Sequence, residues 1–281
     1  MKKLSLTAAC AVVVALGAVS AKAAEITWVS ISSDGGADQE FITYLQGVGH
    51  NVTRFFSHSG LTQAEIDQLN AADLIIQGRA VNSSEYDGAN AVTWNTQITS
   101  PMIAMSGYTT RNNRMGWFTG DTLPDSGPTK VVATDPNHPV FQTPIPVVFD
   151  VDGVTTLLDY NVMIDRGIST PGNGVVAGGN IIANNPATGG VAIAEWPAGT
   201  TVIDEGSVAM VLAGDRYFFG GGSREADGNG VNTAGKFDLT LDTGLPLFIN
   251  TVEYALAPEP STGLLTLFSA IMVGLARRRR R

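Results

Sequence analysis

The amino-acid sequence predicts an α/β fold, in which a parallel β-sheet carries helices on both faces and is extended by a β-rich insertion. Three observations support this prediction. Apolar runs typical of buried strands alternate with helical patterns along the first third of the chain. A stretch rich in Gly, Pro and Asp, from residue 107 to about 199, contains only short β-like runs. An amphipathic helical pattern then closes the body of the protein.

The first third of the body has a regular order of elements. Strands are expected over residues 25–31, 51–56, 73–77 and 101–106, and helices over 38–48, 62–69 and 85–97. Thr62 and Glu65 have the spacing of a capping box, which marks the start of the second helix. Because strands and helices alternate over short connections, the strands should be parallel neighbours in one sheet.

The remaining elements are shorter and less regular. Short β-like runs cover residues 130–133, 147–151 and 191–195. Residues 207–212 and 216–219 flank a three-residue turn and predict a β-hairpin. The closing helix covers about residues 245–256, with Asp242 or Thr243 as its N-cap.

The N-terminus has the three parts of a secretory signal peptide. Lys2 and Lys3 precede an apolar run over residues 4–19, and a cleavage site of small residues ends at Ala23. Cleavage after Ala23 removes Cys10, the single cysteine of the chain. We therefore expect export through the secretion translocon and a mature protein without cysteine.

The C-terminus combines the motif Pro258-Glu259-Pro260, an apolar helix over about residues 260–276, and five arginines at 277–281. The helix could span a membrane if it tilts, with the arginines on the cytoplasmic side. These three parts, in this order, resemble the PEP-CTERM sorting signal of Gram-negative bacteria. The resemblance implies recognition by an exosortase-type transpeptidase, an inner-membrane intermediate, and release or attachment at the cell surface, alongside exopolysaccharide.

The body between these two segments is strongly acidic. Residues 24–257 contain 9 Lys and Arg against 25 Asp and Glu, a formal net charge of −16. A body of this charge has no basic footprint for nucleic acid, so nucleic-acid binding is excluded. The same charge favours solubility outside the cell.

The order of elements, with RYFFGGG at residues 216–222 before the closing helix, resembles the class I glutamine amidotransferase-like superfamily. Residues 135–141 (DPNHPVF) resemble a segment of its trehalose-utilisation-type branch. The resemblance implies a flavodoxin-like domain over residues 24–257, with 107–199 as the β-rich insertion. It also implies a nucleophilic cysteine after a central strand, where this chain has Ser106. We therefore expect a non-catalytic domain in a protein of the cell surface or extracellular matrix.

A secreted serine-type hydrolase, acting on carbohydrate or ester substrates, is an alternative. Ser106 would be the nucleophile and His138 its base, oriented by Asp135 or Asp165. Against this alternative, Ser106 lacks the flanking glycines of a Gly-x-Ser-x-Gly nucleophile elbow.

No cofactor or metal site is expected. The chain has three histidines, of which His50 and His58 stand in loop contexts and are expected at the surface. Residues 150–153 (DVDG) and 227–230 (DGNG) resemble only parts of calcium loops, and turns rich in Asp and Asn explain them without metal. A calcium-stabilised adhesin-like module remains a further alternative.

Polar and aromatic side chains follow the expected strands at the edge where open parallel sheets bind ligands. The candidate ligand-binding residues are Asp34 after the first strand, Arg79 after the third, and Tyr108, Arg111, Arg114 and Trp117 after the fourth. Flat aromatic rings beside arginine donors suit a sugar or a carboxylate-bearing polymer, so extracellular polysaccharide is the expected partner. In the alternative interpretation, arginines and aspartates pin a long loop, and Trp117 belongs to a satellite core.

Overall fold

The computed structural model describes residues 23–31, 38–79, 81–123, 130–150, 153–156, 174–176, 178–220 and 239–257. The segments expected to form the signal peptide and the sorting signal lie outside these residues, with the exception of Ala23. The apolar stretch 260–276 lies outside them too. Within the described part of the chain, no helix is both long enough and apolar enough to cross a membrane.

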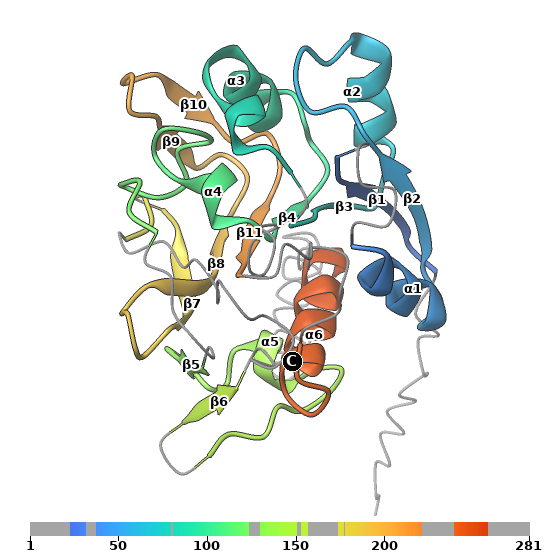
Figure 1. Ribbon diagram of the computed structural model, residues 1–281, viewed down its shortest axis with the longest axis vertical. Coiled ribbons are helices and arrows are strands. Elements are labelled where there is room, and N and C mark those ends of the chain that lie inside the picture. The colour runs from blue at the N-terminus through green and yellow to red at the C-terminus, as the bar shows by residue number, and fades with distance from the viewer. Residues whose placement is uncertain are drawn as a thin grey trace, which may run out of the picture.

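A nine-stranded sheet forms the centre of the molecule (Figure 1). Its strands lie in the order β2 (Asn51–Phe55), β1 (Glu25–Val29), β3 (Leu74–Gln77), β4 (Met102–Ala104), β11 (Arg216–Phe219), β8 (Val191–Trp196), β7 (Asn180–Asn184), β5 (Lys130–Ala133) and β6 (Val154–Thr156). The first five strands are parallel, and the last four pair antiparallel. The parallel part has the strand order 2-1-3-4-5 of a flavodoxin-like sheet, so the predicted α/β class is confirmed.

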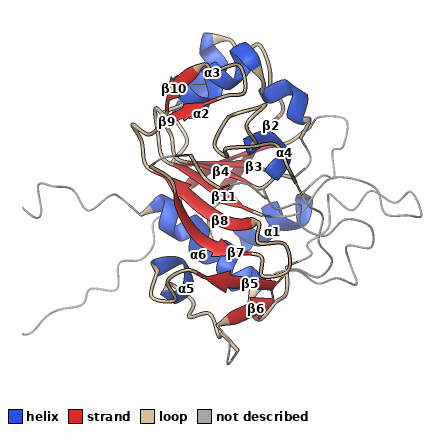
Figure 2. Ribbon diagram, turned by 90° about the vertical axis from the view of Figure 1, so that its left-hand side faces the viewer, coloured by secondary structure: helices blue, strands red, loops and turns tan. Residues whose placement is uncertain are grey.

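Helices cover both faces of this sheet (Figure 1, Figure 2). One face packs against α1 (Gln39–Gly47), α5 (Pro139–Gln142) and α6 (Gly244–Leu256). The other face packs against α2 (Gln63–Asn70), the 3-10 helix η1 (Ser83–Tyr86) and α3 (Gly88–Thr96). Because strand residues alternate between faces, Tyr217 belongs to the first core and its neighbour Phe218 to the second.

A local sequence signal explains where α2 begins, and the starts of α3 and α6 differ from it. Thr62 and Glu65 form the expected capping box at α2: Thr62 Oγ1 accepts from Glu65 N at 3.3 Å, and Glu65 Oε2 accepts from Thr62 N at 2.8 Å. The expected helix 85–97 is divided into η1 and α3 because the backbone of Asp87 between them is extended. Thr243 is the N-cap of α6, although its side chain makes no capping hydrogen bond.

Two predictions about strands are wrong. β10 (Ala209–Val211) does not pair with β11; it pairs with β9 (Thr201–Ile203) in a separate two-stranded sheet. The turn between β10 and β11 packs against the segment that ends α3, which keeps the two strands from pairing with each other. Ala213 N donates to Asn95 O at 2.8 Å, and a Cβ at Gly214 would come within 2.2 Å of Thr99 O. Residues 147–150 form no strand either.

Candidate functional site

The carboxyl ends of β1, β3 and β4 form the edge at which the sequence places a ligand. Asp34 lies outside the described residues. The other predicted residues do not form one group. Arg79 pairs with an aspartate in the interior, Trp117 is fully buried, and Tyr108, Arg111 and Arg114 remain together in the segment that includes α4 (Gly107–Thr110).

Arg79 forms an ion pair with Asp38 inside the protein. Arg79 Nε lies 3.6 Å from Asp38 Oδ1, and neither side chain is exposed. Asp38 Oδ2 accepts from Trp28 Nε1 at 3.3 Å, and Arg79 Cζ lies 5.0 Å from the ring centroid of Phe41. Gly78 permits this approach, because a Cβ there would come within 2.1 Å of Asp38 Oδ2. The structure therefore gives Arg79 a structural role in place of the predicted contact with a ligand.

His50 and His58 are also engaged in buried contacts. His58 Nδ1 lies 3.0 Å from Glu85 Oε2, and His58 Nε2 lies 3.0 Å from the carbonyl oxygen of Ser30. His50 Nε2 lies 3.2 Å from Glu253 Oε1. His50 is 7% exposed and His58 is 3% exposed, so the expectation that they lie at the surface is wrong.

Tyr108, Arg111 and Arg114 are the predicted residues that stay accessible. All three are partly exposed, and Arg111 Cζ lies 5.5 Å from the ring centroid of Tyr108. Arg114 Nη1 donates to the carbonyl of Asn113 at 2.6 Å and lies 3.8 Å from Asp87 Oδ2. The pKa of Arg111 is lowered, first by burial and second by the positive charge of Arg114. Within the described part of the chain, Arg111 has no ion-pair partner.

The backbone around Arg111 is held by its own hydrogen bonds. Arg114 N and Gly116 N both donate to the carbonyl of Arg111 at 3.0 Å, and Trp117 N donates to Thr110 O at 2.9 Å. Gly116 has a φ of +71°, and a Cβ there would lie 3.0 Å from the carbonyl oxygen of Ile203. The loop therefore rests against β9 and is held by hydrogen bonds of its own backbone, and within it Arg114 is close enough to affect the pKa of Arg111.

Trp117 belongs to the hydrophobic core. Its side chain is 0% exposed, and its ring centroid lies 5.3 Å from that of Trp196. Trp117 Nε1 donates to Asn95 Oδ1 at 2.9 Å, so even its polar atom is satisfied within the protein. The interpretation of Trp117 as a core residue is confirmed, and no ring face remains for a sugar.

The register of the sheet separates Ser106 from His138. Ile103, Tyr217 and Glu195 lie opposite one another across β4, β11 and β8, and His138 Nε2 lies 3.6 Å from Glu195 Oε1. Ile103 therefore marks the level of the sheet at which His138 lies. Ser106 comes three residues after Ile103, which is about 10 Å further along the strand direction. Its backbone is still extended, so alternation directs its side chain to the opposite face from that of Ile103.

Both ring nitrogens of His138 are occupied. Nδ1 accepts a hydrogen bond from Val140 N at 3.3 Å, where His138 is the N-cap of α5. The ring proton therefore sits on Nε2, which faces Glu195. This arrangement does not provide the base that a nucleophilic Ser106 would require, and the predicted pair is not brought together.

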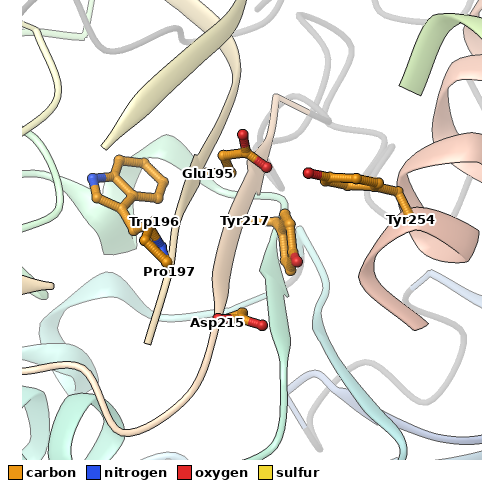
Figure 3. A pocket seen from close by; sticks show the side chains of 6 residues that line it. All are labelled: Glu195, Trp196, Pro197, Asp215, Tyr217 and Tyr254. Carbon is orange, nitrogen blue, oxygen red and sulfur yellow. The ribbon is translucent and has the colours of Figure 1, made fainter. Parts of the chain in front are cut away.

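The structure reveals a cavity that the sequence analysis missed (Figure 3). It has a volume of about 180 Å³ and lies where β8 ends and β11 begins, at the opposite edge of the sheet from the arginines. Its lining consists of Glu195, Trp196, Pro197, Asp215, Tyr217 and Tyr254. Tyr217 is paired with Glu195 across the two strands, and Tyr254 comes from the last turn of α6 with its hydroxyl toward Glu195.

The carboxylate of Glu195 is stabilised in its charged form. Burial by itself would raise the pKa of Glu195, but hydrogen bonds from His138, Asn180 and Tyr254 outweigh burial and lower it. Asn180 Nδ2 donates to Glu195 Oε1 at 2.8 Å. Glu195 therefore contributes a negative charge to the cavity at neutral pH.

No metal site is found in the part of the chain that the structure describes, where no three His, Cys, Asp or Glu side chains come together. Asp150 Oδ1 accepts from Val154 N at 2.8 Å, a hydrogen bond typical of a turn initiated by aspartate. Asp152 and residues 227–230 lie outside the described residues. The calcium-binding alternative stays a prediction.

Comparisons with known proteins identify no family for this chain. No family model and no curated protein matches it. Among solved structures, a glutamine amidotransferase from Thermotoga maritima is similar over 82% of this chain and 81% of its own, at 7% identity and a TM-score of 0.33. A likeness this weak carries no argument about function, so the fold rests on the strand order described above.

Proposed function

We propose that this protein is an exported protein of the cell surface or extracellular matrix, and that its α/β domain binds acidic carbohydrate without catalysing amide transfer. The observation that carries the binding proposal is the arginine pair. Arg111 is partly buried, repelled by Arg114 and without an ion-pair partner in the described residues. An anionic ligand beside the two guanidinium groups would relieve this repulsion.

The chemistry of the arginine pair favours a carboxylate on a sugar ring. A guanidinium binds a carboxylate through two parallel hydrogen bonds, and Arg111 Cζ lies 5.5 Å from the centroid of the aromatic ring of Tyr108. Asp121 and Glu205 lie close enough to raise the pKa of Arg111, but the net shift remains downward. The acidic body repels polyanions at a distance, so binding of an acidic ligand depends on these two guanidinium groups.

Amide transfer lacks its nucleophile in residues 24–281, because Cys10 is the single cysteine and lies in the expected signal peptide. Ser106, which follows the central strand β4, is 4% exposed. This supports a binding domain over an amidotransferase.

Binding is tested by titrating the full-length chain in detergent with polygalacturonate, an acidic polysaccharide, and with dextran, a neutral one. We expect polygalacturonate to bind and dextran not to bind. Replacing Arg111→Gln and Arg114→Gln together should weaken polygalacturonate binding by about tenfold or more. Lys130→Gln, which removes an exposed cation of β5, is the matched control and should leave binding unchanged. Equal binding of both polysaccharides would contradict the proposal.

Export and sorting are supported by the signal-peptide pattern and by the resemblance of residues 258–281 to a PEP-CTERM signal. Replacement of Pro258, Glu259 and Pro260 by alanine should leave the chain in the inner membrane and abolish its appearance at the cell surface. Fractionation of cells with an antibody to the body measures this. Unchanged processing of the alanine variant would refute the sorting proposal without affecting the binding proposal.

A further inference from the structure

The cavity in Figure 3 is lined by two carboxylates and by no Lys or Arg side chain. Hydrogen bonds from its donors keep Glu195 ionised. One of these donors, His138, is not among the residues that line the cavity. Asp215 Oδ1 accepts from Ala198 N at 2.7 Å, which fixes the second carboxylate. The neighbouring cation, Arg216, is fully buried and interacts with the charge of Asp215, but its guanidinium donates to the carbonyl groups of Trp94 and Ile98 on the opposite face. The basic groups nearest to the two carboxylates, His138 and Arg216, thus lie outside the lining, which leaves the cavity itself to an incoming cation.

Two tyrosine rings line the cavity together with these carboxylates. Tyr217 lies between Glu195 and Asp215, and Tyr254 faces Glu195 from α6 (Figure 3). The two rings meet edge to face, with centroids 5.8 Å apart and an interplanar angle of 79°. Strand geometry explains this grouping, because Asp215 and Tyr217 alternate to the same face and Glu195 pairs with Tyr217.

Carboxylates beside aromatic rings form an environment that attracts organic cations. The face of a tyrosine ring is negative and attracts an ammonium group, and a carboxylate adds a charge-assisted hydrogen bond. The volume of about 180 Å³ is below the roughly 300–1,000 Å³ of cavities that hold drug-sized ligands. A single small group, such as one amine with a few carbon atoms, fits this size.

We propose that this cavity binds a protonated organic amine, either a free small amine or the amino group of an amino sugar. The site is independent of the arginine pair, since it lies at the other edge of the sheet and has the opposite charge. The protein would then contact an acidic ligand at one edge and a basic ligand at the other.

Calorimetric titration of the full-length chain in detergent tests this proposal with three probes. Glucosamine has a sugar ring and an ammonium group, glucose has the ring alone, and methylammonium has the charge alone. We expect glucosamine to bind about tenfold or more tightly than glucose. Methylammonium binding as tightly as glucosamine identifies a free amine as the ligand, and weaker binding identifies an amino sugar.

Charge-neutralising variants assign the binding to this cavity. Glu195→Gln and Asp215→Asn keep an oxygen for Asn180 Nδ2 and Ala198 N, and each should weaken glucosamine binding about tenfold. Tyr217→Phe keeps the aromatic face and should retain binding, whereas Tyr217→Leu should lose it. Glu40→Gln, an exposed acid of α1, is the matched control and should bind as the parent does.

Three results would overturn the proposal. They are equal affinity for glucose and glucosamine, absence of binding by every probe, and unchanged affinity in both Glu195→Gln and Asp215→Asn. A thermal melt of each variant accompanies the titrations. If a charge variant does not fold, the pair Tyr217→Phe and Tyr217→Leu decides, because neither changes the charge of the cavity.

Discussion

Asp38 Oδ1 and Arg79 Nε lie 3.6 Å apart in the interior of the protein, where neither side chain is exposed. Asp38 has a left-handed backbone conformation, with a φ of 56°, which aspartate and asparagine adopt more readily than most residues. The ion pair joins the start of α1 to the segment that follows β3. Charged groups at the edge where the sequence places a ligand are thus engaged with one another in the interior.

Breaking this ion pair should cost more than removing it completely. Asp38→Asn keeps a residue that tolerates the left-handed conformation but removes the charge that Asp38 places 3.6 Å from the buried Arg79, so we expect a loss of about 3–5 kcal/mol. Adding Arg79→Met should restore much of this loss, because the buried guanidinium that faces residue 38 is then removed as well. Urea denaturation of the two single variants and the double variant measures the coupling. Additive effects of the two substitutions would contradict it.

Substitutions at Trp117 should affect stability. Trp117→Ala opens a cavity in the core and should cost about 3–5 kcal/mol. Trp117→Phe keeps much of the packing against Trp196 but leaves Asn95 Oδ1 without its donor, which should cost about 1–3 kcal/mol. Urea denaturation measures both. A variant that weakens polygalacturonate binding at unchanged stability would instead restore the interpretation of Trp117 as a ligand contact.

The elements that the sequence predicts well are those whose signals are local. The capping box of Thr62 and Glu65 and the apolar periodicity of α1 and α6 place helices within a residue or two of their observed bounds. The pairing of β10 could not be predicted in this way. Adjacent β-like runs have the same local pattern whether they pair with each other or separate, and contacts of Ala213 and Gly214 with distant residues separate them here.

The candidate site shows the same division between local and distant causes. Arg111 and Tyr108 are close in sequence, so their proximity could be predicted. The burial of Arg79 depends on Asp38, and that of Trp117 on Asn95 and on packing from other segments. The cavity around Glu195 exists because β8 pairs antiparallel with β11, and no spacing in the sequence shows that pairing.

Arg216 should be among the most important residues for stability. It is fully buried, and burial lowers its pKa to about 10, so it remains charged at neutral pH. Its guanidinium donates to the carbonyl groups of Trp94 at 3.1 Å, Ile98 at 2.5 Å and Ser100 at 3.1 Å, which ties the end of α3 to the sheet. Arg216→Lys has too few donors in the right directions to replace these bonds.

We expect Arg216→Lys to lose about 3 kcal/mol or more, because several buried carbonyls are left without a donor. Hydrogen exchange should accelerate in α3 more than in α2, whose contacts do not involve Arg216. Arg54→Lys is the matched control, since Arg54 is only half-buried and donates to Ser30 Oγ at 2.9 Å. Equal acceleration in both helices, or equal loss in the control, would show that Arg216 does not act through α3.

Glu195 should make the stability of the protein depend on pH in the acid range. Its pKa is lowered in the folded state by hydrogen bonds from His138, Asn180 and Tyr254, which outweigh the opposing effect of burial. A carboxylate with a lowered folded pKa contributes stability above its unfolded pKa of about 4.5, and that contribution disappears as the pH falls through the folded pKa.

Glu195→Gln should therefore lose stability less steeply than the parent below pH 4.5, as thermal melts across this range would show. Asn180→Ala removes one donor and should move the acid transition of the parent to higher pH. If the parent and Glu195→Gln melt with the same pH dependence, the hydrogen bonds to Glu195 do not stabilise its charged form.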